Sequence, residues 1–393
     1  MHESLTFGLA ILCAAGAGLL AVQSRTLSRR LRVPAPAVFL AAAALAVRWF
    51  PSIPDPSPRT VQRVVTVCLI AILFEGGMQI GMTRLRGAMW GVLSLGLLGT
   101  VLTVVAAAVL AHLLLGGSWY VAVLVATAIA PTDPAVVFSV LGAGEIEGPA
   151  GTVLEGESGA NDPVGIALMV ALLSGGALTA DALGHVAGTF VLQMAVGLVV
   201  GLVGSRLLLV AMRRIPLPAG LHPLRTLLGA GVVYGLAAVA HGSGFLAVFV
   251  AGLLLGDEEA PHKAEVARFH AAVASLAEVV AFAYLGLTVD LDVLARSDVW
   301  VPGLALGALL AVAVRPLISW PLLRGAGLTR RQEAFVMFAG LKGAVPLLLG
   351  SMLLALSGGD RLYGVVVVVV LVSVIGQGTL VPTAARRLGL RTE

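Results

Sequence analysis

The sequence contains few charged residues. Asp, Glu, Lys and Arg make up 12% of its 393 residues, whereas a soluble domain carries about 25%. Apolar residues make up 59%, and the mean hydropathy is +1.01. These values exclude a soluble globular domain and predict an all-α protein that crosses the membrane many times. The net charge of +4 is too small to indicate nucleic-acid binding. The two cysteines, Cys13 and Cys68, lie in apolar segments and give no information on redox compartment.

Apolar segments of membrane-crossing length recur along the chain, and the short connections leave no room for a soluble domain. The first segment follows Met1, His2 and Glu3 without a basic stretch, so we interpret it as a retained span and not as a cleaved signal. Residues 224–241 and 243–256 are either two separate spans or one broken hairpin. We expect about thirteen spans, at residues 4–22, 34–50, 61–81, 87–115, 119–141, 151–174, 186–212, 224–241, 243–256, 266–289, 299–323, 331–357 and 360–384.

The basic side chains predict the orientation of these spans. With thirteen spans, one side of the membrane receives eighteen of the 25 Lys and Arg residues and the other side receives five. Arg315 and Lys342 lie within spans. Because cytoplasmic loops carry the excess of basic residues, we expect the N-terminus outside and the C-terminus in the cytoplasm, in a cell (inner or plasma) membrane.

A polar stretch interrupts the sixth apolar segment, where Glu155, Glu157, Ser158, Asn161 and Asp162 follow one another closely. An ionisable side chain at membrane depth costs roughly 3 kcal/mol, so such a cluster indicates an ion or proton site. Helical spacing puts Glu157 and Asn161 on one face and Ser158 and Asp162 on the adjacent face. Glu157 and Asp162 are therefore expected to point into one cavity. Alternatively, Glu155 and Glu157 are first-turn acids that complement a helix dipole.

Two further segments contain residues that break helices. Residues 130–134 include two prolines three apart, and residues 340–346 include two glycines and a proline. If the seventh segment is a linker, each break falls in the fifth span of a six-span half, and the second half is inverted. Paired breaks of this kind indicate the binding site of a transporter, although simple proline kinks are the alternative.

Each break also carries a charge. We expect Asp133 to offset the positive helix ends at the first break and Lys342 to offset the negative ends at the second. Arg315 needs a carboxylate partner, for which Glu157 is the candidate. Glu75 either lines the site or forms a structural ion pair. Glu278 faces an internal cavity or a partner subunit.

Four motifs together resemble the NhaP/NHE-type cation:proton antiporters. Residues 157–163 look like the family's Asn-Asp motif, residues 132–134 and 340–345 are similar to its two unwound helices, and residues 73–77 match its third span. The resemblance covers nearly the whole chain in the expected order. Lys342 departs from the arginine that is usual at its position, and lysine cannot make the planar fork of a guanidinium.

The resemblance implies two inverted six-helix repeats with two crossed, unwound helices. It also implies a dimerisation part (about 1–86 and 222–290), a core transport part (about 87–180 and 298–386) and a linker (about 186–212). The resemblance further implies a homodimer and electroneutral exchange. Asp162 would carry the cation or the proton, with Thr132, Ser158, Glu75 and Asp133 at the site. Asn161 would hold the two broken helices, and Glu157, Arg315 and Lys342 would complete a polar core. No cofactor is expected.

Two other classes of function remain as alternatives. A formal Gly-x-Ser-Gly string at residues 156–159 suggests an intramembrane serine protease, but the histidines fall near span ends, away from a mid-membrane serine. A passive cation channel would need rings of carbonyls or acids along a pore. Among cations, the oxygen ligands suit sodium (with lithium) or potassium. Potassium-type relatives with similar motifs usually carry a cytoplasmic regulatory tail. Because this sequence shows no such tail, we expect sodium.

Overall fold

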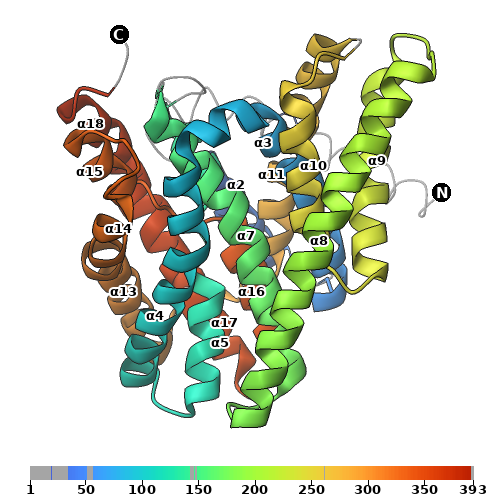
Figure 1. Ribbon diagram of the computed structural model, residues 1–393. Helices are drawn as coiled ribbons and strands as arrows, with labels where there is room; N and C mark the ends of the chain where they lie inside the picture. Colours follow the sequence, from blue (N-terminus) through green and yellow to red (C-terminus); the bar gives the residue numbers. More distant parts are fainter. Residues whose placement is uncertain are drawn as a thin grey trace.

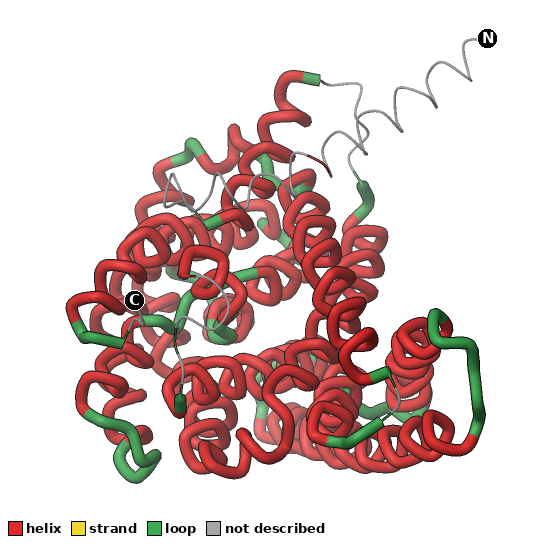
Figure 2. The backbone as a smooth tube through the Cα atoms, turned by 90° about the horizontal axis from the view of Figure 1, so that it is seen from above, coloured by secondary structure: helices red, strands yellow, loops and turns green. Residues whose placement is uncertain are grey.

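The computed structural model describes residues 34–50, 56–141, 148–260 and 262–390, together with Leu19 and Ile146. The described part of the chain is built from helices and loops without strands (Figure 2). Most helices run side by side along one direction (Figure 1). Apart from Leu19, the expected first span at 4–22 lies outside the described residues, and so do the basic residues from Arg25 to Arg32.

The helices follow the expected apolar segments. The α-helices are α2 (Ala35–Trp49), α3 (Pro58–Leu93), α4 (Thr100–Leu115), α5 (Trp119–Ile129), α6 (Pro134–Leu141), α7 (Pro149–Gly175), α8 (Ala180–Arg214), α9 (Leu221–Val239), α10 (Gly244–Asp257), α11 (Lys263–Leu287), α12 (Leu291–Leu294), α13 (Ser297–Leu309), α14 (Arg315–Leu323), α15 (Arg330–Phe338), α16 (Ala344–Met352), α17 (Gly359–Leu371) and α18 (Val381–Arg387). Short π-helical or 3-10 turns join several of them, at Ser94–Gly99, Leu310–Val314, Leu353–Ala355, Val372–Gln377 and Gly378–Leu380.

Six helices in the described part of the chain are long and apolar enough to cross a membrane. They are Pro58–Leu115, Trp119–Leu141, Ala180–Arg214, Lys263–Leu287, Ser297–Leu323 and Gly359–Arg387. Helix α7 has 27 residues but is not among them, because its polar stretch lowers its hydropathy. Three shorter apolar helices add to the set. The molecule is an integral membrane protein.

Polar side chains at the helix starts fix where these apolar helices begin. Ser57, Ser118, Thr179, Ser243 and Thr329 each accept a hydrogen bond from the backbone N–H three residues later. Such caps satisfy N–H groups that have no partner within the helix. Because unpaired backbone groups are costly next to lipid, the caps fix the helix ends as well as stabilising them.

A kink at Gly81, where the backbone is not helical, divides α3 into two helical parts. Gly81 has φ of +66°, a conformation that favours glycine, and the backbone N–H of Thr83 donates a hydrogen bond to the Asp257 carboxylate there. The third and fourth expected spans therefore meet at this kink. Residues 224–241 and 243–256 are separate helices, because α9 ends at Val239 and α10 begins at Gly244.

Helix α3 is a centre of packing, since it lies against α7, α10 and α11. A second group consists of α4, α5, α13, α16 and α17, each of which packs against at least two of the others. In Figure 1, α7 and α16 lie near the middle, α8 and α9 at one edge, and α13 to α15 at the opposite edge. The polar stretch of α7 therefore faces neighbours from both groups.

Candidate functional site

Both expected helix breaks are present, and they touch. Helix α5 ends at Ile129 and α6 begins at Pro134, while α15 ends at Phe338 and α16 begins at Ala344. The backbone N–H of Asp133 in the first break donates a 2.7 Å hydrogen bond to the carbonyl of Leu341 in the second. The two unwound segments are thus joined inside the protein, where irregular backbone is tolerated at membrane depth.

Asp133 bridges the starts of both second half-helices. Its Oδ1 accepts a 2.9 Å hydrogen bond from the N–H of Ala135 in α6, and its Oδ2 accepts a 3.3 Å hydrogen bond from the N–H of Ala344 in α16. Helix N-termini carry partial positive charge, so one carboxylate compensates two helix ends. The expectation for Asp133 named only the first break, and the contact between the breaks explains the second role.

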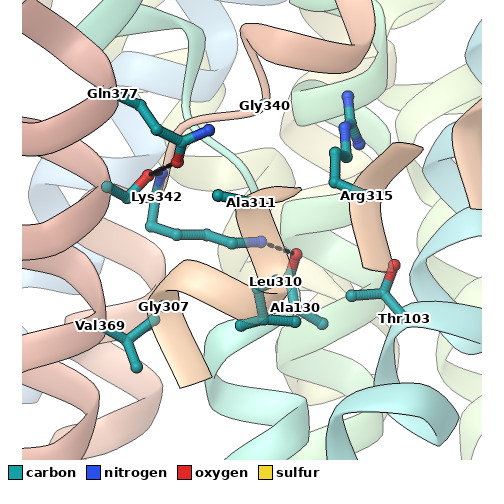
Figure 3. A pocket seen from close by; sticks show the side chains of 11 residues that line it. Thr103, Ala130, Gly307, Leu310, Ala311, Arg315, Gly340, Lys342, Val369 and Gln377 are labelled. Atoms are coloured by element: carbon teal, nitrogen blue, oxygen red, sulfur yellow. Dashed lines mark hydrogen bonds between the residues drawn. The ribbon is translucent and has the colours of Figure 1, made fainter. Parts of the chain in front are cut away.

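Lys342 acts on the break opposite to the one that we expected. Its Nζ donates a 2.7 Å hydrogen bond to the carbonyl of Ala130, which ends α5, across a small pocket (Figure 3). Its own backbone N–H donates to the Ser373 hydroxyl at 3.0 Å, and Ser373 donates to Gln377. The expectation that Lys342 serves the second break was therefore wrong, because the two breaks lie against each other.

Gly343 gives Asp133 the space to reach both helix ends. A Cβ atom at Gly343 would overlap the Asp133 side chain. We expect Gly343→Ala to displace the carboxylate and to lower the melting temperature in detergent, because two helix N-termini lose their acceptor. Gly231→Ala is a matched control, because that glycine lies inside α9 with open space beside it. Equal melting temperatures for both variants would contradict this role of Asp133.

Asn161 connects α7 to the first break. Its Nδ2 donates a 2.8 Å hydrogen bond to the Thr132 hydroxyl, and its Oδ1 accepts a 3.3 Å hydrogen bond from the Thr132 backbone N–H. Both side chains are buried. The Thr132 side chain is therefore occupied by Asn161, and Thr132 is not among the residues that line the large cavity described below.

Glu157 and Arg315 meet in the interior. The Arg315 Nη2 lies 2.7 Å from the Glu157 Oε2, and Nη1 donates to Oε1. Nη2 also donates to the carbonyl of Val336 in α15 at 3.2 Å. The Glu157 and Arg315 side chains are 2% and 13% exposed. This bidentate pair joins α7 to α14 and α15.

A cavity of about 300 Å³ lies between α3, α7 and α11 and reaches the starts of α6 and α16. Five carboxylates are among the side chains that line it, from Glu75, Asp133, Glu155, Asp162 and Glu278. Asp162 is only 6% exposed. Within the described part of the chain, its Oδ1 is buried and has no hydrogen-bond partner. Ser158 lies one helical turn before Asp162 on α7, and Ser158 and Asp133 line the same cavity.

One backbone carbonyl in the polar stretch of α7 lacks its usual partner within the helix. Pro163 lies inside the helix and cannot donate a hydrogen bond to the carbonyl of Gly159 four residues earlier. Gly159 also lines the cavity. Carboxylate, hydroxyl and carbonyl oxygens are hard ligands that suit alkali or other hard cations. Among the described residues, no three His, Cys, Asp or Glu side chains come together closely enough to hold a metal ion.

The cavity differs from the sequence-based expectation at two positions of α7. Glu157 does not line it with Asp162, because its side chain is directed to Arg315. Glu155 lines it instead, and it lies well beyond the first turn of α7, which begins at Pro149 and has no first-turn acid. The interpretation of these two glutamates as first-turn acids was therefore wrong. Of the two readings of Glu278, the internal cavity is the one that the structure shows.

Two polar residues that line the cavity were not predicted from the sequence. Gln79 lies one helical turn from Glu75, and both side chains line the cavity. Ser275 lies three residues before Glu278 on α11, and both line the cavity. The helical spacing of each residue from a carboxylate already singled out was the signal that could have identified it.

Comparisons with known proteins match this architecture. Residues 18–387 match the family described as sodium/hydrogen exchanger, transmembrane. The K(+)/H(+) antiporter NhaP2 of Shewanella sp. (strain ANA-3) is 32% identical over 91% of this chain and 63% of its own length. The Na(+)/H(+) antiporter NhaP of Pseudomonas aeruginosa is 29% identical over 83% of this chain and 81% of its own length.

A solved structure has the same fold. The sodium proton antiporter MjNhaP1 from Methanocaldococcus jannaschii at pH 8 superposes with a TM-score of 0.79 and 21% identity, covering 96% of this chain and all of that one. The match along residues 18–387 and the 32% identity to an antiporter over 91% of the chain carry the assignment. The chain belongs to the sodium/hydrogen exchanger family.

Proposed function

We propose that the protein is a secondary antiporter that exchanges a monovalent cation for a proton by alternating access, with Asp162 as the shared carrier. The observation that carries this proposal is the buried Asp162 carboxylate, which has an unpartnered oxygen and faces a cavity at two joined helix breaks. Family membership supports it. The chain spans 63% of the length of the Shewanella relative.

Competition at one carboxylate is sufficient to couple the two fluxes. A proton or a cation neutralises Asp162, whereas the bare carboxylate is costly to move through the centre of the bilayer. Only the two neutral forms of the carrier then change sides. Asn161, next to Asp162, carries no charge of its own, and its amide is occupied by Thr132. One cation should therefore exchange for one proton.

Asp133 and Lys342 contribute by stabilising the broken helices around the carrier. They hold three half-helix ends, at Ala130, Ala135 and Ala344, through the hydrogen bonds described above. The site is thereby preorganised at the point where freed backbone and side-chain oxygens meet. Glu75 and Ser158 line the same cavity as Asp162 and are the proposed additional ligands.

Sodium (with lithium) is the cation that we propose first, and potassium is the second candidate. The relative from Pseudomonas aeruginosa is named a Na(+)/H(+) antiporter, which supports sodium. The relatives from Shewanella are named K(+)/H(+) antiporters, which supports potassium. Both ions are compatible with a site made of oxygen ligands.

The test is a flux assay with purified protein in proteoliposomes. We expect an imposed pH gradient to drive saturable uptake of Na⁺, Li⁺ or K⁺, and we expect a voltage-sensitive dye to report no membrane potential, because one charge moves each way. Empty liposomes are the control. Cation flux that neither saturates nor moves protons would indicate a channel, and an electrogenic signal would exclude one-for-one exchange.

We propose a homodimer in a cell membrane, with the C-terminus in the cytoplasm. Residues of about 1–86 and 222–290 would form the dimerisation part, and those of about 87–180 and 298–386 the moving core. The packing of α3 with α10 and α11, and of α4 and α5 with α13, α16 and α17, supports this division.

A further inference from the structure

One face of α7 lines the cavity. Glu155, Ser158 and Asp162 are three and four residues apart, so they lie on one stripe of the helix, and all three line the cavity. Glu155 is about 10 Å from Asp162 along the helix axis, at 1.5 Å per residue. The Glu155 side chain is 20% exposed, whereas Asp162 is buried. The mouth of the cavity is therefore at the Glu155 end.

Arg84 of α3 lies beside Glu155. Its side chain is 50% exposed, and its Nη2 lies 3.7 Å from the Glu155 Oε2, which is too long for a hydrogen bond. The guanidinium is held instead by neutral acceptors. Nη1 donates to the carbonyl of Gln79 at 3.1 Å, and Nη2 donates to the Thr152 hydroxyl at 3.3 Å.

Glu155 is consequently a carboxylate with a loosely held positive partner. Its Oε2 is buried and accepts no hydrogen bond from the described residues. This contrasts with Glu157, whose two oxygens are both hydrogen-bonded by Arg315. The Arg84 side chain is half-exposed, so solvent screens its charge, and a mobile cation can compete with it for Glu155. Glu75 lines the same cavity.

We propose that Arg84 and Glu155 form an exchangeable ion pair at the mouth of the cavity, in which Arg84 is a tethered competitor of the incoming cation. The cation displaces the Arg84 guanidinium from Glu155, and the guanidinium moves into solvent. The cation then continues along this stripe of α7 to Asp162. Glu155 thereby lowers the cation concentration that half-saturates the site, and Arg84 raises it. This inference rests on the proposed function.

The proposal predicts opposite effects for the two partners. Arg84→Gln should lower the half-saturating cation concentration by about two- to five-fold, because the competitor is lost. Glu155→Gln should raise it by a similar factor, because the attracting charge is lost. The maximal exchange rate should change little, since Asp162 is intact. If the pair served only to pack α3 against α7, both variants would alter the melting temperature or the maximal rate in the same direction.

The experiment titrates Na⁺ and, separately, K⁺ in proteoliposomes under one imposed pH gradient. Arg86→Gln is the matched control, because Arg86 lies on the same helix but lines a different cavity with Arg206. An unchanged or raised half-saturating concentration in Arg84→Gln, with an active wild type, overturns the inference and leaves the proposed function intact. If Arg84→Gln does not fold, an unchanged value in Glu155→Gln overturns it. A wild type that exchanges neither cation removes the proposed function and this inference with it.

Discussion

Replacing Asp162 by asparagine should abolish cation:proton exchange and leave the protein folded. Asparagine has nearly the same shape as aspartate, but it neither binds a proton at this position nor offers a negative charge to a cation. The side chain is 6% exposed, and its Oδ1 has no hydrogen-bond partner among the described residues. Losing the charge therefore removes the carrier without breaking a hydrogen bond of that oxygen. Removing an uncompensated buried charge should also preserve or raise the melting temperature.

Proteoliposome flux and melting in detergent together check this result. Asp181→Asn is the control, because Asp181 is an exposed first-turn acid of α8. In the wild type, competition requires the half-saturating cation concentration to rise as pH falls, by up to about ten-fold per pH unit once the proton occupies most of the carrier. Exchange that persists in Asp162→Asn, or a half-saturating concentration independent of pH, would contradict a shared carrier.

Local sequence signals were sufficient to locate the breaks and the polar stretch. Proline lacks an N–H, so Pro131 and Pro134 predicted the break between α5 and α6, and the residues from Gly340 to Pro346 predicted the one between α15 and α16. Arg315 needed a carboxylate in a membrane segment, and Glu157 is the one that it meets. These predictions succeeded because each follows from an unavoidable cost at membrane depth.

The direction of individual side chains depended on contacts between distant segments. Glu155 and Glu157 are two residues apart, yet one lines the cavity and the other is paired with Arg315, 158 residues away. Lys342 caps α5, 212 residues earlier in the chain, because the two breaks touch. Helical periodicity gives the angle between two side chains on one helix, but not which neighbouring helix each of them meets.

Removing one partner of the Glu157–Arg315 pair should strongly destabilise the polar core. Both charges are almost fully desolvated, and both carboxylate oxygens are hydrogen-bonded. Removing one partner leaves the other charge buried without compensation, which costs about 3–5 kcal/mol. We expect Glu157→Gln and Arg315→Ala each to lower the melting temperature in detergent. We also expect both to reduce exchange, because α7 loses its attachment to α14 and α15.

The double variant distinguishes a true pair from two independent sites. Once one charge is gone, losing the second removes the uncompensated charge, so the combined loss of stability should be clearly smaller than the sum of the single losses. Arg48→Ala combined with Asp292→Asn is a matched comparison, because that pair is exposed and each change should cost little. Additive losses for Glu157→Gln and Arg315→Ala would mean that the two charges do not stabilise each other, and the polar core would then be held by the hydrogen bonds of Asn161, Asp133 and Lys342.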